Sequence, residues 1–226
     1  MKTAKKALLL SLCAIMLVAA TVMGTLAYLS DTDKVDNTFT VGKIEITLDE
    51  AKTNEDGKLL DKDGNVITNL EDSPRVQQNE YKIVPGCNYH KDPTVHVQAG
   101  SEKSILYITV ENQMAPVVDN EFIEAQMLDY GWEDTGLTKD GMKVYYRLCD
   151  ATTEVTHFPV FTGIRADMAA DEADLAEVDG KHIIVNAYAV QQAGWSEDLG
   201  PVTRPLTGKA LAVAAWEGSF GAPEIA

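Results

Sequence analysis

Cysteine and histidine are scarce in this sequence. Among 226 residues there are three Cys and four His. No CxxC, HExxH, GxSxG, Walker or dinucleotide-binding pattern occurs, which excludes the recognisable signatures of redox thiols, zinc proteases, serine hydrolases and nucleotide binders. The acids are numerous and scattered, so no pair stands out as general acid and base. We therefore identify no catalytic residue and do not expect an enzyme.

Basic residues are also few, with 19 Lys and Arg against 35 Asp and Glu and a formal net charge of −16. Such an excess of negative charge makes nucleic acid and anionic membrane surfaces unfavourable partners. It suits a soluble extracellular protein that meets divalent cations. The alternative interpretation is that the acids are simply a solvated surface.

Charge is absent altogether from residues 7–27, an apolar stretch that follows three lysines. The small residues Thr25 and Ala27 stand at positions −3 and −1 before Tyr28. This pattern predicts a helical signal peptide over residues 1–27, with an uncleaved membrane anchor as the alternative. Its removal takes the net charge from −16 to −19.

Two cysteines, Cys87 and Cys149, follow the signal segment. In an exported protein they can form one disulfide. Spacing in the sequence does not show whether the two thiols lie within bonding distance. Both the paired and the unpaired state therefore stay open.

Short apolar or alternating stretches separated by turn residues recur along the chain. They span residues 39–48, 76–84, 94–97, 104–111, 122–128, 144–148, 158–161 and 182–190. About eight such strands predict an antiparallel β-sandwich in one domain, residues 28–226. A change of phase predicts a bend at Gly42. Alanine-rich stretches at 167–178 and 208–216 predict two short helices, the second within a C-terminal helix and tail over 206–226.

Residues 49–75 form an acidic insertion with two glycines, Gly57 and Gly64. Leu59-Leu60 and Val66-Ile67 flank a turn rich in Asp and Gly, which predicts a β-hairpin. A weaker hypothesis is calcium binding by an EF-hand-like loop. Its ligands would include Asp61, Asp63, Asn65 and Asp72. Val66 occupies the position where that loop needs glycine, so the hairpin is the better interpretation.

His90 and His96 are six residues apart and would share one face of an unbroken strand. Pro93 lies between them and argues against such a strand. A zinc site at this pair is a weak hypothesis, and two surface histidines beside a turn are the alternative.

Residues 8–48 carry a resemblance to a known family. The leader followed by Thr-Leu-Ala-Tyr-Leu-Ser-Asp-Thr-Asp, residues 25–33, and by Asn-Thr-Phe-Thr-Val-Gly-Lys-Ile, residues 37–44, resembles the SipW-dependent-type leader and first strand of the TasA/camelysin family. Residues 84–95 and 184–192 are similar to secreted members. The resemblance implies a jelly-roll sandwich, cleavage between Ala27 and Tyr28 by a dedicated signal peptidase, and assembly into extracellular fibres of a biofilm matrix.

The resemblance also implies an assembly mode. Residues 28–40 would be donated as a strand to another copy or to a related matrix protein, since an unpaired sandwich edge invites a strand. The residues of this assembly arm that we single out are Tyr28, Leu29, Val35, Phe39 and Thr40. Membrane contact would occur only through the uncleaved signal, and no cofactor is expected, calcium aside. The alternatives are a camelysin-like cell-surface metalloprotease, whose zinc motif the sequence lacks, and a calcium-stabilised monomeric surface adhesin.

Overall fold

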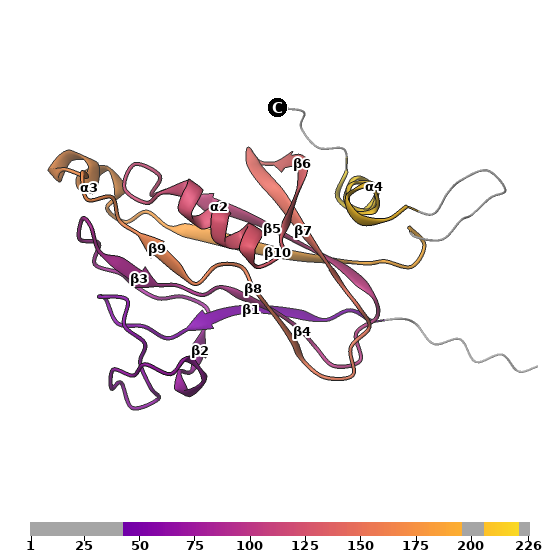
Figure 1. Ribbon diagram of the computed structural model, residues 1–226, viewed down its shortest axis with the longest axis horizontal. Helices are drawn as coiled ribbons and strands as arrows, with labels where there is room; N and C mark the ends of the chain where they lie inside the picture. The colour runs from indigo at the N-terminus through magenta and orange to yellow at the C-terminus, as the bar shows by residue number, and fades with distance from the viewer. Residues whose placement is uncertain (1–42, 196–205, 222–226) are drawn as a thin grey trace, which may run out of the picture. The chain divides into compact units, whose positions relative to one another are not determined.

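A computed structural model describes residues 43–195 and 206–221 of the chain (Figure 1). The predicted signal peptide, the cleavage residues, the assembly arm and the bend at Gly42 lie outside the described residues. The residues concerned are Thr25, Ala27, Tyr28, Leu29, Val35, Phe39 and Thr40.

The described chain is mainly β, and its strands form three antiparallel sheets. The first sheet has the order β2 (Arg75–Val76), β1 (Ile46–Ala51), β4 (Thr94–Val97) and β8 (Thr156–Pro159). The second has the order β10 (Ile183–Gln191), β5 (Ser104–Asn112), β7 (Met142–Cys149) and β6 (Glu133–Lys139). The third pairs β3 (Asn88–His90) with β9 (Gly163–Arg165). The expected antiparallel, mainly β fold is confirmed.

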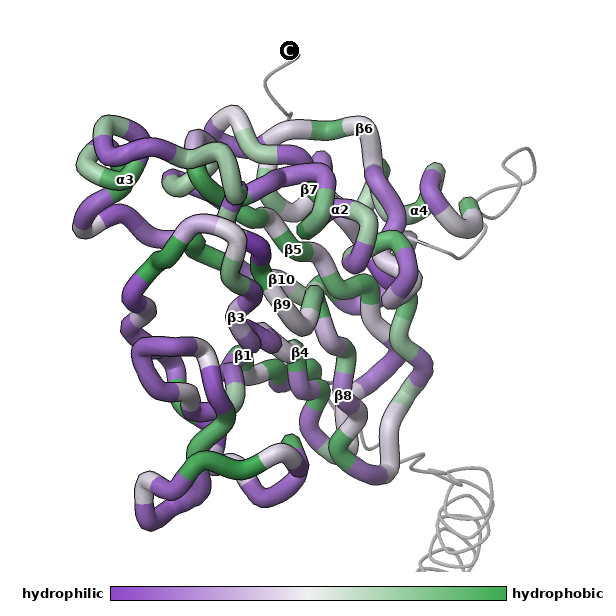
Figure 2. Tube along the Cα trace, turned by 60° about the vertical axis from the view of Figure 1, so that its left-hand side comes forward, coloured by the Kyte–Doolittle hydropathy of each residue, from purple (hydrophilic) through white to green (hydrophobic). Residues whose placement is uncertain are grey.

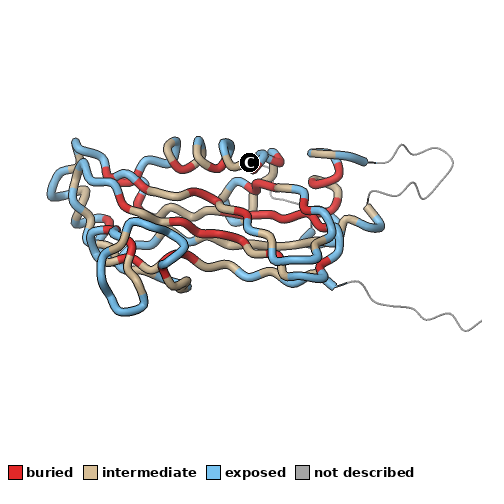
Figure 3. Tube along the Cα trace, turned by 60° about the horizontal axis from the view of Figure 1, so that its bottom comes forward, coloured by how far each residue is buried: buried red, intermediate tan, exposed pale blue. Residues whose placement is uncertain are grey.

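Strand β5 is buried on both of its faces, which explains why both are apolar. Leu106 and Ile108 pack in the cluster that also holds Val95 and Val97 of β4. Ile105 and its neighbours on the opposite face belong to a second cluster. Buried residues follow the middles of the strands, whereas the connecting loops are mostly exposed (Figure 3).

Helix α4 (Gly208–Phe220) covers the second apolar face of this sheet. Trp216 is 2% exposed, and its ring centroid lies 5.0 Å from that of Tyr107 and 5.5 Å from that of Tyr188. The Tyr107 hydroxyl donates a hydrogen bond of 2.7 Å to the carbonyl of Ala212. The predicted C-terminal helix is therefore present and forms a third layer.

The strand predicted over 122–128 is wrong, because this segment is helix α2 (Asn120–Asp129). The Asp119 side chain accepts a hydrogen bond from the backbone N–H of Glu121 and caps the helix. Ile123 and Met127 are one helical turn apart, and both are buried. That spacing of four residues places both side chains on one face of a helix.

Helix α3 (Glu172–Val178) lies within the stretch predicted to be helical and starts later than expected. Asp171 and Asp174 form a capping box that fixes its start. None of the helices within 43–195 and 206–221 is long and apolar enough to cross a membrane.

Most of the strand predicted over 76–84 is also wrong, since β2 ends at Val76. The segment after β2 is held by side-chain hydrogen bonds and not by the backbone hydrogen bonds of a strand pair. The Tyr81 hydroxyl donates to the carbonyl of His90, and the Tyr89 hydroxyl accepts from the backbone N–H of Val84.

The hairpin expected in the acidic insertion is confirmed. Leu60 and Val66 form an antiparallel bridge, and the backbone N–H of Asp61 donates to the carbonyl of Asn65. Gly64 turns the chain with φ 85°, a conformation that glycine adopts without strain. The loops between β1 and β3 are largely hydrophilic (Figure 2), and a single-turn 3₁₀ helix, η1 (Leu70–Asp72), closes the insertion.

The third layer yields a prediction about stability. Trp216→Ala removes a fully buried indole and leaves a cavity between α4 and the sheet, so it should lower the free energy of unfolding by about 3–5 kcal/mol. Urea unfolding followed by circular dichroism measures this change. Glu217→Ala is the matched control because the neighbouring side chain is exposed, and it should change stability by less than about 0.5 kcal/mol. Equal effects of both changes would contradict a packed third layer.

Candidate functional site

Strand β10 has an unpaired edge. All nine of its residues pair with β5, and within the described parts of the chain no strand pairs with its other side. Such an edge presents a row of backbone N–H and C=O groups that can pair with another strand.

Strand β1 has a second unpaired edge. Its residues Ile46–Asp49 pair with β4, whereas β2 pairs with Glu50 and Ala51 alone. The side of Ile46–Asp49 away from β4 therefore has no strand partner in the described ranges. β1 and β10 approach each other across the two sheets, so both unpaired edges lie on the same side of the sandwich, with β1 in one layer and β10 in the other (Figure 1).

A groove of about 760 Å³ lies on this side. Leu48 and Asp49 of β1, together with Ile183–Val185 of β10, line part of its wall. Further wall residues come from the 77–83 segment and from α3. On β10, the apolar side chains at alternate positions pack only partly into the core between the sheets. These half-buried residues are Ile183, Val185, Ala187 and Ala189.

The composition of β10 offers no protection against added strands. Its sequence, IIVNAYAVQ, contains no charge and no proline. Natural edge strands are usually interrupted by lysine, proline or a bulge, or are kept very short. The nine unbroken residues of β10 do none of this, so this edge is suited to accept a further strand.

Buried polar contacts fix one end of the groove. Lys91 Nζ lies 2.7 Å from Glu50 Oε2, with side chains only 12% and 5% exposed. Asn79 Nδ2 donates to Glu50 Oε1 over 2.9 Å. Arg75 donates to Asp49 and to Asp92, each over 2.6 Å. These pairs hold the end of β1 and the 75–79 segment together, which makes the groove wall rigid.

Asp92 is the most buried charged member of this network, at 2% exposure. Burial alone raises the pKa of its carboxyl, but nearby His90, the backbone N–H of Ala51 and the guanidinium of Arg75 favour the charged form more strongly. Its pKa therefore lies below the ordinary value. The Ala51 N–H donates to it over 2.7 Å.

The two histidines singled out in the sequence do not come together. His90 Nε2 lies 3.5 Å from Asp92 Oδ1, whereas His96 Nε2 lies 2.7 Å from Asp49 Oδ1. The other ring nitrogen of His96, Nδ1, lies 2.5 Å from Nδ1 of His157 on β8. Sequence reasoning missed His157, because the pairing of β4 with β8 joins residues 61 positions apart.

The acidic residues considered for calcium belong to two separate turns. Asp61 accepts hydrogen bonds from the backbone N–H groups of Asp63 and Asn65. Asp72 accepts from the side chain of Asn69 in the next turn. Within the residues that the structure describes, no group of three or more His, Cys, Asp or Glu is arranged to hold a metal ion.

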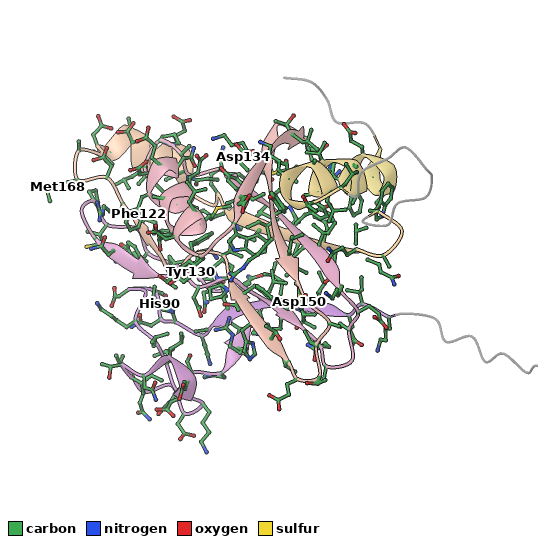
Figure 4. The ribbon with its side chains drawn as sticks, turned by 45° about the vertical axis from the view of Figure 1, so that its right-hand side comes forward. His90, Phe122, Tyr130, Asp134, Asp150 and Met168 are labelled. Atoms are coloured by element: carbon green, nitrogen blue, oxygen red, sulfur yellow. The ribbon has the colours of Figure 1, made fainter. Side chains whose placement is uncertain are left out.

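The disulfide that the sequence allowed is not formed, and both thiols are free. Cys87 is exposed and follows Gly86, over which Met168 packs. Cys149 is buried beside Asp150. Figure 4 shows that Met168, which packs next to the Cys87 turn, lies far from Asp150, which follows Cys149. Burial raises the pKa of the Cys149 thiol, which disfavours the reactive thiolate.

Comparison with known proteins identifies no relative of this chain. The chain matches no family model, no curated protein and no solved structure. The interpretation of the groove therefore depends on its geometry and on the sequence.

The buried network yields a pH-dependent prediction. Asp92→Asn removes the more buried of the two carboxylates that pair with Arg75 and leaves Asp49 as the partner charge, so it should lower stability at pH 7 by about 1.5–3 kcal/mol. Because the folded-state pKa of Asp92 is lowered, its contribution is present above the ordinary Asp pKa of about 3.9 and is lost as the pH falls through the folded-state value. The difference between the two proteins should therefore shrink below about pH 4, as measured by urea unfolding across pH.

Asp150→Asn is the control, because the Asp150 side chain is 90% exposed and its ion pair with Lys103 lies at the surface. It should have little effect at any pH. A constant penalty for Asp92→Asn from pH 7 to pH 3 would show that the carboxylate charge does not hold this network.

Proposed function

We propose that this protein is an exported structural subunit of an extracellular matrix. Its copies assemble when the N-terminal arm of one copy adds as a strand to the open side of another. The observation that supports this most directly is the nine-residue, uncharged edge of β10 beside the groove, which has no strand partner among residues 43–195 and 206–221. Strand addition to such an edge supplies backbone hydrogen bonds, and the groove supplies pockets for alternate side chains.

The arm has the length and pattern that this role needs. Residues 28–40 would extend over about 43 Å as a strand, against about 30 Å for the nine residues of β10. Leu29, Val35 and Phe39 all occupy odd positions. In an extended strand they would share one face, and that face can pack against the half-buried apolar residues of β10 and β1.

Export would control when assembly begins. In this proposal a signal peptidase cleaves after Ala27, and the arm is then free to leave the membrane. The two four-stranded sheets of the sandwich support the further proposal of a jelly-roll arrangement. The acidic composition would keep cleaved but unassembled copies soluble through mutual repulsion.

Removing the arm tests its role. A protein starting at Tyr28 should form fibres visible by electron microscopy, whereas one starting at Gly42 should stay monomeric in analytical ultracentrifugation. Adding a peptide of residues 28–41 to the shorter protein should fill its open edge and raise its melting temperature. Equal fibres from both proteins would overturn the role of the arm. Monomers from both would overturn assembly as the function.

The edge of β10 is tested by two substitutions on this strand, one inside the groove and one outside it. Val185→Lys places an ammonium where the donated strand would pack, and burying an unpaired charge costs several kcal/mol, so assembly should weaken at least about 100-fold. Gln191→Lys is the matched control, because its side chain is exposed and it lies at the end of β10, outside the groove wall; it should assemble normally. Sedimentation measures assembly, and circular dichroism checks that both variants fold. Unchanged assembly of a folded Val185→Lys protein would exclude the groove.

A further inference from the structure

A pair of histidines lies on the outer face of the first sheet, away from the groove. His96 of β4 is directly opposite His157 of β8. Their neighbours Val95, Val97 and Phe158 point into the core, so the two imidazoles point outward. The rings meet edge to face, with centroids 4.7 Å apart and an interplanar angle of 81°. The two Nδ1 atoms lie 2.5 Å apart.

The surrounding hydrogen bonds define the tautomers of this pair. Asp49 lies 2.7 Å from His96 Nε2, and a carboxylate can only accept, so Nε2 carries the proton. In the neutral tautomer that this contact fits, Nδ1 of His96 carries the lone pair and can accept the Nδ1 proton of His157. Arg75 in turn donates to Asp49 over 2.6 Å and keeps the carboxylate in place.

We propose that His96 and His157 bind one divalent transition metal ion through their Nδ1 atoms, with Cu²⁺ bound most tightly. The ion would take the position of the shared proton, and that proton would move to Nε2 of His157, so both rings stay neutral. Asp49 and Arg75 would orient His96 from behind, as outer carboxylates do at histidine metal sites. The remaining coordination positions face solvent and would hold water.

The separation of the two nitrogens favours copper over zinc. With metal–nitrogen bonds of about 2.0 Å, nitrogens at the right angle of a tetragonal site are about 2.8 Å apart, and at a tetrahedral angle about 3.3 Å. The observed nitrogen–nitrogen distance of 2.5 Å is closer to the tetragonal value, so the two rings need to move apart less for a tetragonal ion than for a tetrahedral one. Copper(II) prefers that geometry and also forms the most stable complexes of the divalent first-row ions.

The site is accessible and can open. His157 is exposed, while the His96 side chain is 12% exposed. The exposed ring of His157 can rotate to widen the pair, and the half-buried ring of His96 stays fixed by Asp49. A pair with one fixed and one adjustable ligand can admit an ion without moving either strand.

The test uses the full chain without a histidine tag and titrates it with Cu²⁺ by calorimetry, with electron paramagnetic resonance of the bound ion. We expect one site and hyperfine structure from two nitrogens. His96→Ala and His157→Ala should each weaken binding at least tenfold. Asp49→Asn should weaken it by about 10-fold while the two-nitrogen signal stays, because it changes the orientation of His96 and not the ligand set.

His182→Ala is the matched control, because His182 is exposed and lies just before β10; it should bind copper as the unmodified protein does. His157→Ala removes an exposed ring, and circular dichroism will show that it folds. Binding that survives in folded His157→Ala, binding lost equally in His182→Ala, or a signal without two nitrogens would each overturn the proposal. Tighter binding of Zn²⁺ than Cu²⁺ would overturn the assignment of the metal.

Discussion

The architecture depends on covering both faces of the second sheet. Strand β5 is apolar on both sides, so the sheet needs a layer against each face. The first sheet supplies one layer and α4 the other. Within the described residues this sheet has two edge strands, β6 and β10, and β10 is the one without charged residues. The same packing that completes the core thus leaves this edge as the natural place for a further strand.

Ion pairs stabilise the groove wall on the side of the sandwich where the edges of β1 and β10 lie. Glu50, Asp49 and Asp92 lie at the end of β1 or beside it, and each has a basic partner within 2.7 Å. Buried ion pairs contribute little net stability but are costly to break, so they fix geometry more than they add free energy. The wall of the groove is accordingly preformed, whereas the edge of β10 beside it has no strand partner in the part of the chain that the structure describes.

The sequence predicted the parts of the fold that depend on local pattern. β4, β5 and β10 follow from their apolar residues, and α4 from its alanine-rich stretch, although the helix continues through Gly218 to Phe220. α2 was missed because Phe122, Ile123 and Met127 fit a short apolar run as well as one helical face. β6 was missed because Glu133–Lys139 is mostly polar. The partners of β10 and the meeting of His96 with His157 depend on strand register over long separations, which no local pattern encodes.

Asp49 belongs to two regions of the molecule at once. It lines the groove beside β10, and on the outer face it holds His96. An occupant of the groove and an ion on the histidine pair would therefore act on one shared carboxylate. If the bound ion changes the affinity of the groove for a strand, thermodynamic reciprocity requires that the bound strand changes the affinity of the histidine pair for the ion by the same factor. Fibre growth and the supply of metal in the surroundings would be linked through a single side chain.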